Sequence, residues 1–224
     1  MIDIAIGLRE LGKSTYANYL ASLRKRRVFI DPRMQWPAED PYLKVDKAEM
    51  LQDLDDCRDI VVQPLKLEDT IEELAEVIQA WILERRADPN IDLAIVFDEA
   101  GLYKESLTRE WGFVFRCSPR KHTSLIVTAH RVMDINTTIR AIADTWHMFR
   151  ITEEDELDPI SKRCGSAVAE ALPTLKPYEF VSWYNLPDRK PTVCRDSESW
   201  REPRATPVPS EELTVPRKPQ GTLW

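Results

Sequence analysis

The sequence predicts an α/β fold in which helices cover both faces of a mostly parallel central sheet. Short apolar segments recur along the chain, separated by segments long enough to form helices; they are residues 2–6, 28–32, 59–64, 93–97, 124–128 and 146–151. Segments that are apolar throughout are typical of strands in parallel sheets, which are buried on both faces. Their alternation with helices favours crossover connections between parallel strands. The 224 residues are enough for one such domain with one core.

The first half of the chain begins with a strand over residues 2–6, followed by a loop bounded by glycines. A helix is predicted over 14–27, and it ends in the basic run 24–27. Positive charge complements the dipole at a helix C-terminus, and we favour this interpretation of the run over contact with nucleic acid. The strands at 28–32 and 59–64 each end in proline and flank an acidic helix predicted over 47–56. Residues 67–86 carry apolar side chains at helical spacing, which predicts a long amphipathic helix.

The composition limits the class of protein. Seven prolines interrupt a polar sequence from Leu186 onward, so we predict a domain over 1–185 and an extended or disordered Pro-rich tail over 186–224. No apolar run approaches the roughly 18 residues that an integral membrane segment needs, and the acidic start is unlike a signal peptide. The four cysteines are spaced too irregularly for a zinc site, so we expect reduced thiols. A net charge of −7 argues against a protein that coats nucleic acid with its whole surface.

A phosphate-binding motif follows the first predicted strand. Residues 7–14 match the pattern G-x-x-x-x-G-K-[ST] at every fixed position, and the match opens a predicted helix. Backbone N–H groups in such a loop face phosphate oxygens, while Lys13 would neutralise the β and γ phosphates and Ser14 would bind Mg²⁺. The sequence therefore predicts a site for ATP and Mg²⁺. The predicted ATP-binding residues are Gly7, Leu8, Arg9, Glu10, Leu11, Gly12, Lys13, Ser14 and Thr15.

Two carboxylates follow the apolar strand at 93–97. Asp98 is placed to hold Mg²⁺ through water, and Glu99 to orient and polarise the attacking water. A strand that ends in Asp-Glu is by itself often no more than a strand end that meets solvent. Paired with the phosphate-binding motif upstream, it predicts a site that hydrolyses ATP, with Lys13 and Glu99 as catalytic residues.

Further candidates lie on the segments that follow. His130 ends the next predicted strand, at the edge of the sheet where ligands bind in open α/β folds, and we predict that it senses the γ-phosphate or the attacking water. A surface histidine at a strand end is the alternative. We expect His147, within an apolar strand, to be a packed core residue. An arginine finger that reaches a neighbouring subunit's nucleotide is predicted among four candidates, with a solvated helix face as the alternative for each. In order of preference they are Arg120, Arg116, Arg140 and Arg109.

Together these residues resemble the FtsK/HerA branch of P-loop motors, in particular the small genome-packaging ATPases of tailless viruses with an internal membrane. The resemblance spans about residues 2–157. It includes the loop at 7–14, the pair Asp98-Glu99, the basic residues before the strand that leads to His130, and the pair Ile139-Arg140. More distantly, the chain is similar to the zonula occludens toxin-like assembly ATPases of filamentous phages.

The resemblance implies a three-layer P-loop NTPase fold of the RecA-like type, with an additional strand and a catalytic glutamate. It also implies a homo-oligomeric ring, a hexamer by preference, that couples ATP hydrolysis to translocation of double-stranded DNA into a capsid. The tail would then contact capsid or membrane-vertex proteins. The expected location is the host cytoplasm, and the virion at its packaging vertex.

Two alternatives stay open from the sequence. A small P-loop kinase also has a short chain and an N-terminal phosphate loop, but Glu99 directly after Asp98 and the lack of an obvious arginine-rich lid count against it. A nucleotide-dependent scaffold, or a phage assembly ATPase that does not translocate DNA, would use the Pro-rich tail to recruit partners. Stimulation of phosphate release by duplex DNA would separate a motor from a scaffold.

Overall fold

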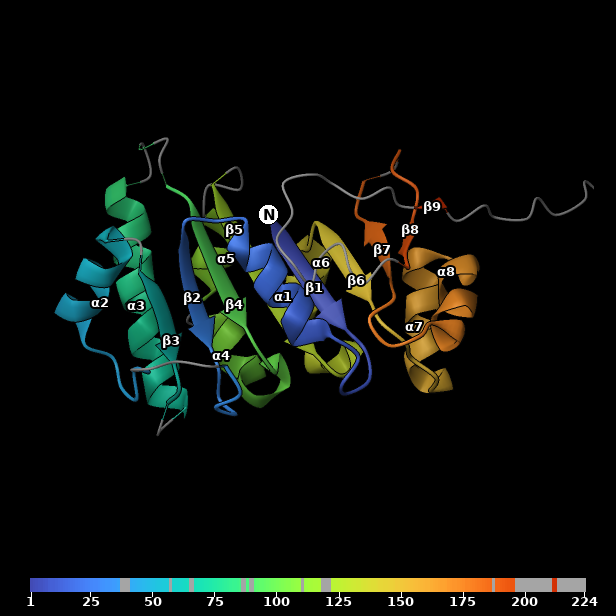
Figure 1. Cartoon of the computed structure of the whole chain (residues 1–224), viewed down its shortest axis with the longest axis horizontal. Coiled ribbons are helices and arrows are strands. Elements are labelled where there is room, and N and C mark those ends of the chain that lie inside the picture. Colours follow the sequence, from blue (N-terminus) through green and yellow to red (C-terminus); the bar gives the residue numbers. More distant parts are fainter. Residues whose placement is uncertain are drawn as a thin grey trace, which may run out of the picture.

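The computed structural model is built around one twisted sheet, shown in Figure 1. The structure describes residues 1–36, 41–56, 58–64, 67–85, 88, 91–109, 111–117, 122–186, 188–195 and 211–212. In this part of the chain the sheet has nine strands in the order β3-β2-β4-β5-β1-β6-β7-β8-β9. The order is not the sequence order, so strands far apart in the chain become neighbours.

Six strands are parallel, as the apolar segments predicted. They are β1 (Ile2–Ile6), β2 (Arg26–Ile30), β3 (Asp59–Val62), β4 (Leu93–Phe97), β5 (Thr123–Ala129) and β6 (Thr145–Met148). β7 (Phe180–Tyr184), β8 (Thr192–Cys194) and β9 (Glu211–Glu212) extend the sheet in antiparallel fashion beyond β6. The sheet therefore continues past the predicted domain boundary at 185. Residues 196–210 and 213–224 of the predicted tail lie outside the described residues.

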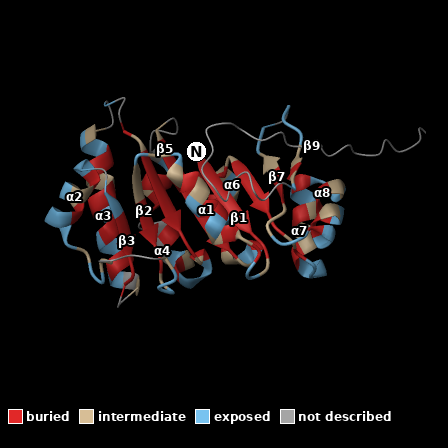
Figure 2. Cartoon of the chain, in the orientation of Figure 1, coloured by how far each residue is buried: buried red, intermediate tan, exposed pale blue. Residues whose placement is uncertain are grey.

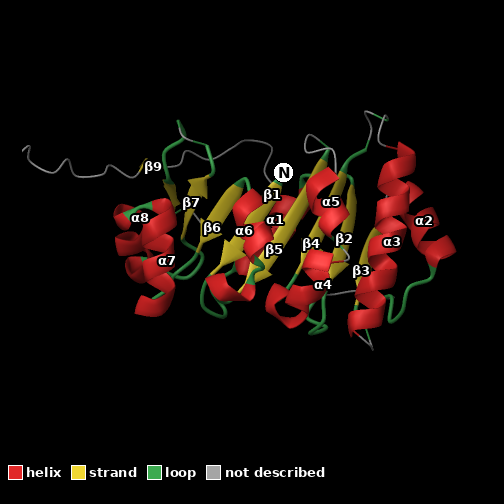
Figure 3. Cartoon of the chain, turned by 180° about the vertical axis from the view of Figure 1, so that it is seen from behind, coloured by secondary structure: helices red, strands yellow, loops and turns green. Residues whose placement is uncertain are grey.

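Helices cover the two faces of the sheet unequally. α1 (Lys13–Ser22) packs on one face, while α3 (Leu67–Arg85), α4 (Lys104–Arg109), α5 (Gly112–Cys117) and α6 (Thr137–Ile142) lie on the other, as Figure 3 shows from behind. α2 (Lys47–Asp55) flanks the β3 edge, and α7 (Glu154–Cys164) and α8 (Ser166–Ala171) lie toward the opposite edge (Figure 1). Short 3-10 helices are η1 (Ala100–Tyr103), η2 (Val132–Asp134) and η3 (Leu172–Thr174). The α/β class with covered faces is confirmed.

The alternation of side chains along each strand divides the core into two parts. In β1, Ile2, Ile4 and Ile6 belong to the larger cluster under the four-helix face, whereas Ala5 belongs to the smaller cluster under α1. Buried residues run through the whole parallel sheet in Figure 2. Within the described residues, no helix combines the length and apolar character that crossing a membrane requires.

The basic run at 24–27 differs from its prediction as a helix end. α1 ends at Ser22, and Arg26 and Arg27 already belong to β2. Arg24 pairs with Asp92 at 3.2 Å, and Arg27 pairs with Asp59 on the neighbouring strand β3. The prediction of dipole complementation was wrong because acidic partners from distant segments bind these arginines at the amino edge of the sheet.

His147 is a packed core residue, as expected. It is 5% exposed, its Nδ1 lies 2.9 Å from Ser182 Oγ, and its Nε2 lies 3.3 Å from Asp3 Oδ1. The ring packs edge-on against Tyr16 of α1, with 4.8 Å between ring centroids. These contacts connect β1, β6, β7 and α1, so the histidine has a structural role.

Candidate nucleotide site

The phosphate-binding motif forms the turn between β1 and α1. Gly12 is the N-cap of α1 and has φ 98, a left-handed conformation that favours glycine. Gly7 has φ 142, and a Cβ placed on it would come within 2.8 Å of Phe149 Cβ. Both fixed glycines of the motif are thus required by the backbone. Glu10, between them, is also left-handed at φ 59.

Lys13 lies over the loop and is almost completely enclosed. Its Nζ donates to Leu8 O at 2.8 Å and lies 3.3 Å from His130 Nδ1. Lys13 as a whole is only 7% exposed. Burial lowers the pKa of Lys13 from 10.5 to about 8, and the carboxylates of Glu99 and Asp98 oppose this shift. A buried cation next to a helix N-terminus is a suitable site for a phosphate group.

Asp98 lies at the carboxyl end of β4, beside the start of α1. Ser14 Oγ donates to Asp98 Oδ1 at 3.2 Å, and Thr128 Oγ1 donates to the same oxygen. The indole Nε1 of Trp36 lies 3.3 Å from the other carboxylate oxygen. β5 stands between β1 and β4 in the sheet, so Thr128 at its end lies beside Asp98 and also lines the cavity in front of the loop.

The Ser14 hydroxyl and the Asp98 carboxylate fit a magnesium ion. Both present hard oxygen donors on one side of the loop, and Mg²⁺ bound to a nucleotide takes one or two protein ligands plus phosphate oxygens and water. Among the described residues no group of three His, Cys, Asp or Glu side chains could hold a metal ion. A magnesium ion shared with phosphates does not need such a group.

Glu99 is held in a strained backbone conformation directly after Asp98. Its φ is 54, and its N–H donates to Thr128 Oγ1 at 3.0 Å. Its Oε1 lies 2.8 Å from His130 Nε2, which is close enough for an ion pair, but the angles do not make a hydrogen bond. Its Oε2 lies 3.7 Å from Arg33 Nη2. Glu99, His130 and Lys13 therefore face one another across the loop.

These side chains surround a single cavity of about 440 Å³ at the carboxyl edge of the parallel strands. The structure thus places the loop around Lys13 and the Asp98-Glu99 pair on the same side of the sheet, as the sequence required. Leu8 and Leu11 of the loop face the small core cluster instead. The residues that line the cavity are Arg9, Glu10, Gly12, Lys13, Ser14, Thr15, Arg33, Gln35, Glu99, Thr128, His130 and Tyr178.

Of the candidate arginine fingers, the two whose side chains are described, Arg116 and Arg140, do not line this cavity in their own chain. Arg116 is exposed on α5 and its Nε donates to Gly112 O at 3.1 Å. Arg140 on α6 donates to Thr137 Oγ1 at 3.1 Å. Arg120 lies outside the described residues, as does the side chain of Arg109.

Sequence reasoning missed Arg33, Trp36 and Tyr178, which the structure brings to the site. Arg33 and Trp36 follow the carboxyl end of β2, so the rule that pointed to His130 after β5 could have found them. Tyr178 comes from the segment before β7, and no local pattern in the sequence connects it with the loop.

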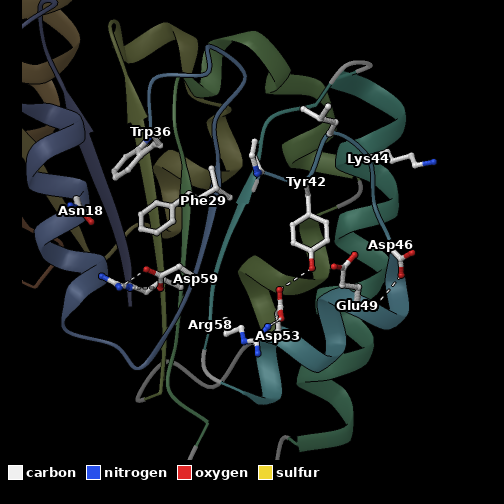
Figure 4. Close-up of a pocket in the computed structure, with 14 residues that line it drawn as sticks. Asn18, Phe29, Trp36, Tyr42, Lys44, Asp46, Glu49, Asp53, Arg58 and Asp59 are labelled. Carbon is white, nitrogen blue, oxygen red and sulfur yellow. Dashed lines mark hydrogen bonds and ion pairs between the residues drawn. The ribbon is translucent and has the colours of Figure 1, made fainter. Parts of the chain in front are cut away.

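A second, larger cavity of about 990 Å³ lies over β2 and β3, between α1 and α2, and Figure 4 shows it. The rings of Phe29 and Trp36 pack at 4.5 Å between centroids, and Tyr42 OH donates to Asp53 at 2.9 Å. Its lining carries acidic and basic side chains together, and Arg27 and Arg58 are already paired with Asp59 and Asp53, so its described residues present no buried cation for a phosphate group. The smaller cavity, not this one, fits a triphosphate.

The strand order, the loop between β1 and α1, and the insertion of β5 between β1 and β4 define a P-loop NTPase fold. Solved structures agree. The genome packaging NTPase B204 from Sulfolobus turreted icosahedral virus 2, in complex with ATP-gammaS, aligns with a TM-score of 0.66 and 20% identity over 86% of this chain and 95% of that chain. The DNA-packaging ATPase B204 from Sulfolobus turreted icosahedral virus aligns with a TM-score of 0.65 and 21% identity over the same shares.

A more distant structure has the same fold within a longer chain. The conjugation coupling protein TcpA of pCW3, in monomer form with ATPgS, aligns with a TM-score of 0.56 and 14% identity over 82% of this chain and 57% of that chain. No protein-family model and no curated protein sequence matches this chain. At these identities the likeness establishes the fold.

Proposed function

We propose that this protein is an ATPase that drives translocation of double-stranded DNA, as a viral genome-packaging motor. The observation that carries the proposal is that Lys13, Ser14 and Glu99 line one cavity and that Ser14 is hydrogen-bonded to Asp98, although the two segments are more than eighty residues apart. The likeness to the two B204 packaging proteins supports the particular kind of motor.

The residues divide the chemistry of hydrolysis among them. Backbone N–H groups of the loop and the N-terminus of α1 bind the phosphates, and Lys13 neutralises charge on the β and γ groups. Ser14 and Asp98 would hold Mg²⁺, which offsets charge on the phosphate oxygens when bound. Glu99 positions the attacking water, because its carboxylate lines the same cavity as Lys13 and lies 2.8 Å from His130 Nε2.

His130 fits a sensor between the phosphate and the water. Its Nδ1 faces the Lys13 ammonium at 3.3 Å, and its Nε2 faces the Glu99 carboxylate at 2.8 Å. A γ-phosphate that draws Lys13 away would change the contacts of His130 and so the position of Glu99. The remaining charge on the transition state would be stabilised by an arginine from a neighbouring subunit of a ring, for which six subunits are the preferred number.

Replacement of Lys13 tests the loop. We expect Lys13→Ala to lose ATP binding and turnover by at least about 100-fold, because the charged partner of the β and γ phosphates is removed. Calorimetry with MgATP and a phosphate-release assay measure the two effects. Lys25→Ala, at an exposed site beyond the other end of α1, is the matched control and should keep both. Hydrolysis at nearly the normal rate in Lys13→Ala would contradict the site.

Duplex DNA tests the coupling. A translocase should release phosphate several-fold faster when double-stranded DNA is present, whereas a nucleotide-dependent scaffold should not respond. The steady-state rate with duplex DNA, with single-stranded DNA and without DNA gives the comparison, with Glu99→Gln as the blank. A rate that duplex DNA leaves unchanged would favour the scaffold, with the C-terminal tail as the segment that recruits capsid or membrane-vertex proteins.

A further inference from the structure

The site has a direction, which follows from the order of the strands. Asp98 and Glu99 follow β4, and His130 follows β5, so the residues suited to the β and γ phosphates lie on the β4/β5 side of β1. A nucleotide with its γ-phosphate at this end must extend its nucleoside toward the other neighbour of β1, which is β6. The inference below therefore rests on the proposed nucleotide site.

On the β6 side, the segments after β6 and before β7 are attached to the loop by two backbone hydrogen bonds. Leu8 N donates to Arg150 O at 3.2 Å, just after β6. Tyr178 N donates to Leu11 O at 3.0 Å, just before β7. Among the described residues that line the cavity, Tyr178 is the only tyrosine, phenylalanine or tryptophan. Part of its ring packs on the core cluster under α1, and it is half-buried.

Tyr178 occupies a position in its turn that tyrosine normally avoids. Lys176, Pro177, Tyr178 and Glu179 form a β-turn in which Glu179 N donates to Lys176 O at 3.1 Å. Proline in the second position and φ 68 at Tyr178 in the third define a type II turn, where glycine or asparagine is favoured. Neither the turn nor the hydrogen bond to Leu11 needs the aromatic side chain. Strain of this kind is kept where a side chain has a function.

We propose that the ring of Tyr178 stacks on the nucleoside of the bound nucleotide, and that the turn at 176–179 is its platform. Stacking between an aromatic ring and a base is strong and nearly independent of the base. Tyr178 should therefore raise the affinity for ATP and for GTP alike. The triphosphate itself depends on the loop and Lys13, not on this ring.

The test compares ATP with inorganic tripolyphosphate, which has the phosphates but no nucleoside. Tyr178→Gly removes the ring and suits the left-handed backbone, which offsets in part the packing lost from the core cluster, and the melting temperature shows whether the variant is folded. By calorimetry with Mg²⁺ present, we expect it to bind ATP and GTP about tenfold more weakly and tripolyphosphate with unchanged affinity. Tyr178→Phe, which keeps the ring, should bind ATP like the parent.

Two results would overturn the proposal. Unchanged ATP affinity in Tyr178→Gly would show that the ring makes no contact with the nucleoside. An equal loss for ATP and tripolyphosphate would show that Tyr178 acts only by shaping the loop. Failure of the proposed function gives a different pattern, since a parent protein that binds ATP without hydrolysing it would refute the ATPase and leave the stacking result as measured.

Discussion

At the scale of single residues, Lys13, His130 and Glu99 form a short chain of contacts across the loop. The Lys13 ammonium can only donate, so His130 Nδ1 accepts from it, while His130 Nε2 lies 2.8 Å from Glu99 Oε1. Arg33 approaches the same carboxylate from the end of β2. The positions of Glu99 and Lys13 are therefore linked through His130, which makes both residues sensitive to bound phosphate.

Glu99→Gln should separate binding from chemistry. The amide keeps the size of the side chain but is a much weaker base, so we expect ATP affinity within about threefold of the parent and a turnover lower by at least about 100-fold. Calorimetry and phosphate release measure the two quantities. Glu105→Gln, on the exposed surface of α4, is the control. If turnover in Glu99→Gln were normal, another residue would have to position the water.

The lowered pKa of Lys13 predicts proton uptake on binding. Without nucleotide, Lys13 loses its proton above about pH 8. A bound triphosphate favours the charged form and raises this pKa, so at pH 9 the complex should take up close to one proton, and at pH 7 almost none. Calorimetry in buffers with different ionisation enthalpies counts these protons.

The control for proton uptake is Lys13→Arg, whose guanidinium stays charged throughout. Any nucleotide that it binds should cause no uptake at pH 9. Equal uptake in the parent and in Lys13→Arg would assign the proton to another group, and the burial of Lys13 would then have no effect on binding.

At the scale of elements, the junctions at the carboxyl edge of the sheet decide the geometry of the site. β5 separates β1 from β4, and Thr128 at its end accepts from Glu99 N and donates to Asp98. The loop is fixed on its other side by Arg150 O and by the close approach of Phe149 to Gly7. Each contact joins segments that are distant in the sequence.

Gly7→Ala should disturb the loop more than its small size suggests. The new Cβ would meet Phe149 Cβ at 2.8 Å, on a backbone with φ 142. We expect a loss of about 2–4 kcal/mol in the free energy of unfolding, from overpacking together with backbone strain. Urea unfolding measures the loss, and ATP binding should weaken in parallel.

Gly165→Ala is the matched control, because Gly165 also has positive φ but no atom within 4 Å of an added Cβ. It should cost only the backbone strain, about 1–2 kcal/mol, and should leave ATP binding intact. Equal losses in the two variants would mean that contact with Phe149 does not determine the loop.

At the scale of the whole molecule, no candidate arginine finger in the described residues lines its own chain's cavity. If the finger acts between subunits, Lys13→Ala subunits and subunits that lack the finger are each inactive but complement one another. In an equal mixture, about a quarter of the head-to-tail interfaces would join an intact Lys13 from one subunit to an intact arginine from the next. Phosphate release from mixtures with Arg120→Ala, Arg116→Ala or Arg140→Ala should therefore recover for one of the three. If none of the three lowers turnover alone, the finger is not among them.

The sequence by itself determined the six parallel strands, the loop and the carboxylate pair, but not the antiparallel strands β7, β8 and β9. Apolar runs are buried wherever the chain folds, and the spacing of Gly7, Gly12, Lys13 and Ser14 is covalent, so local patterns were sufficient. The tertiary structure alone decided that Tyr178 joins the site and that Arg24 and Arg27 pair with distant acids. These contacts depend on the order of strands in the sheet and on the approach of turns that are distant in the sequence. The residues next to each of them in the chain form no pattern that predicts them.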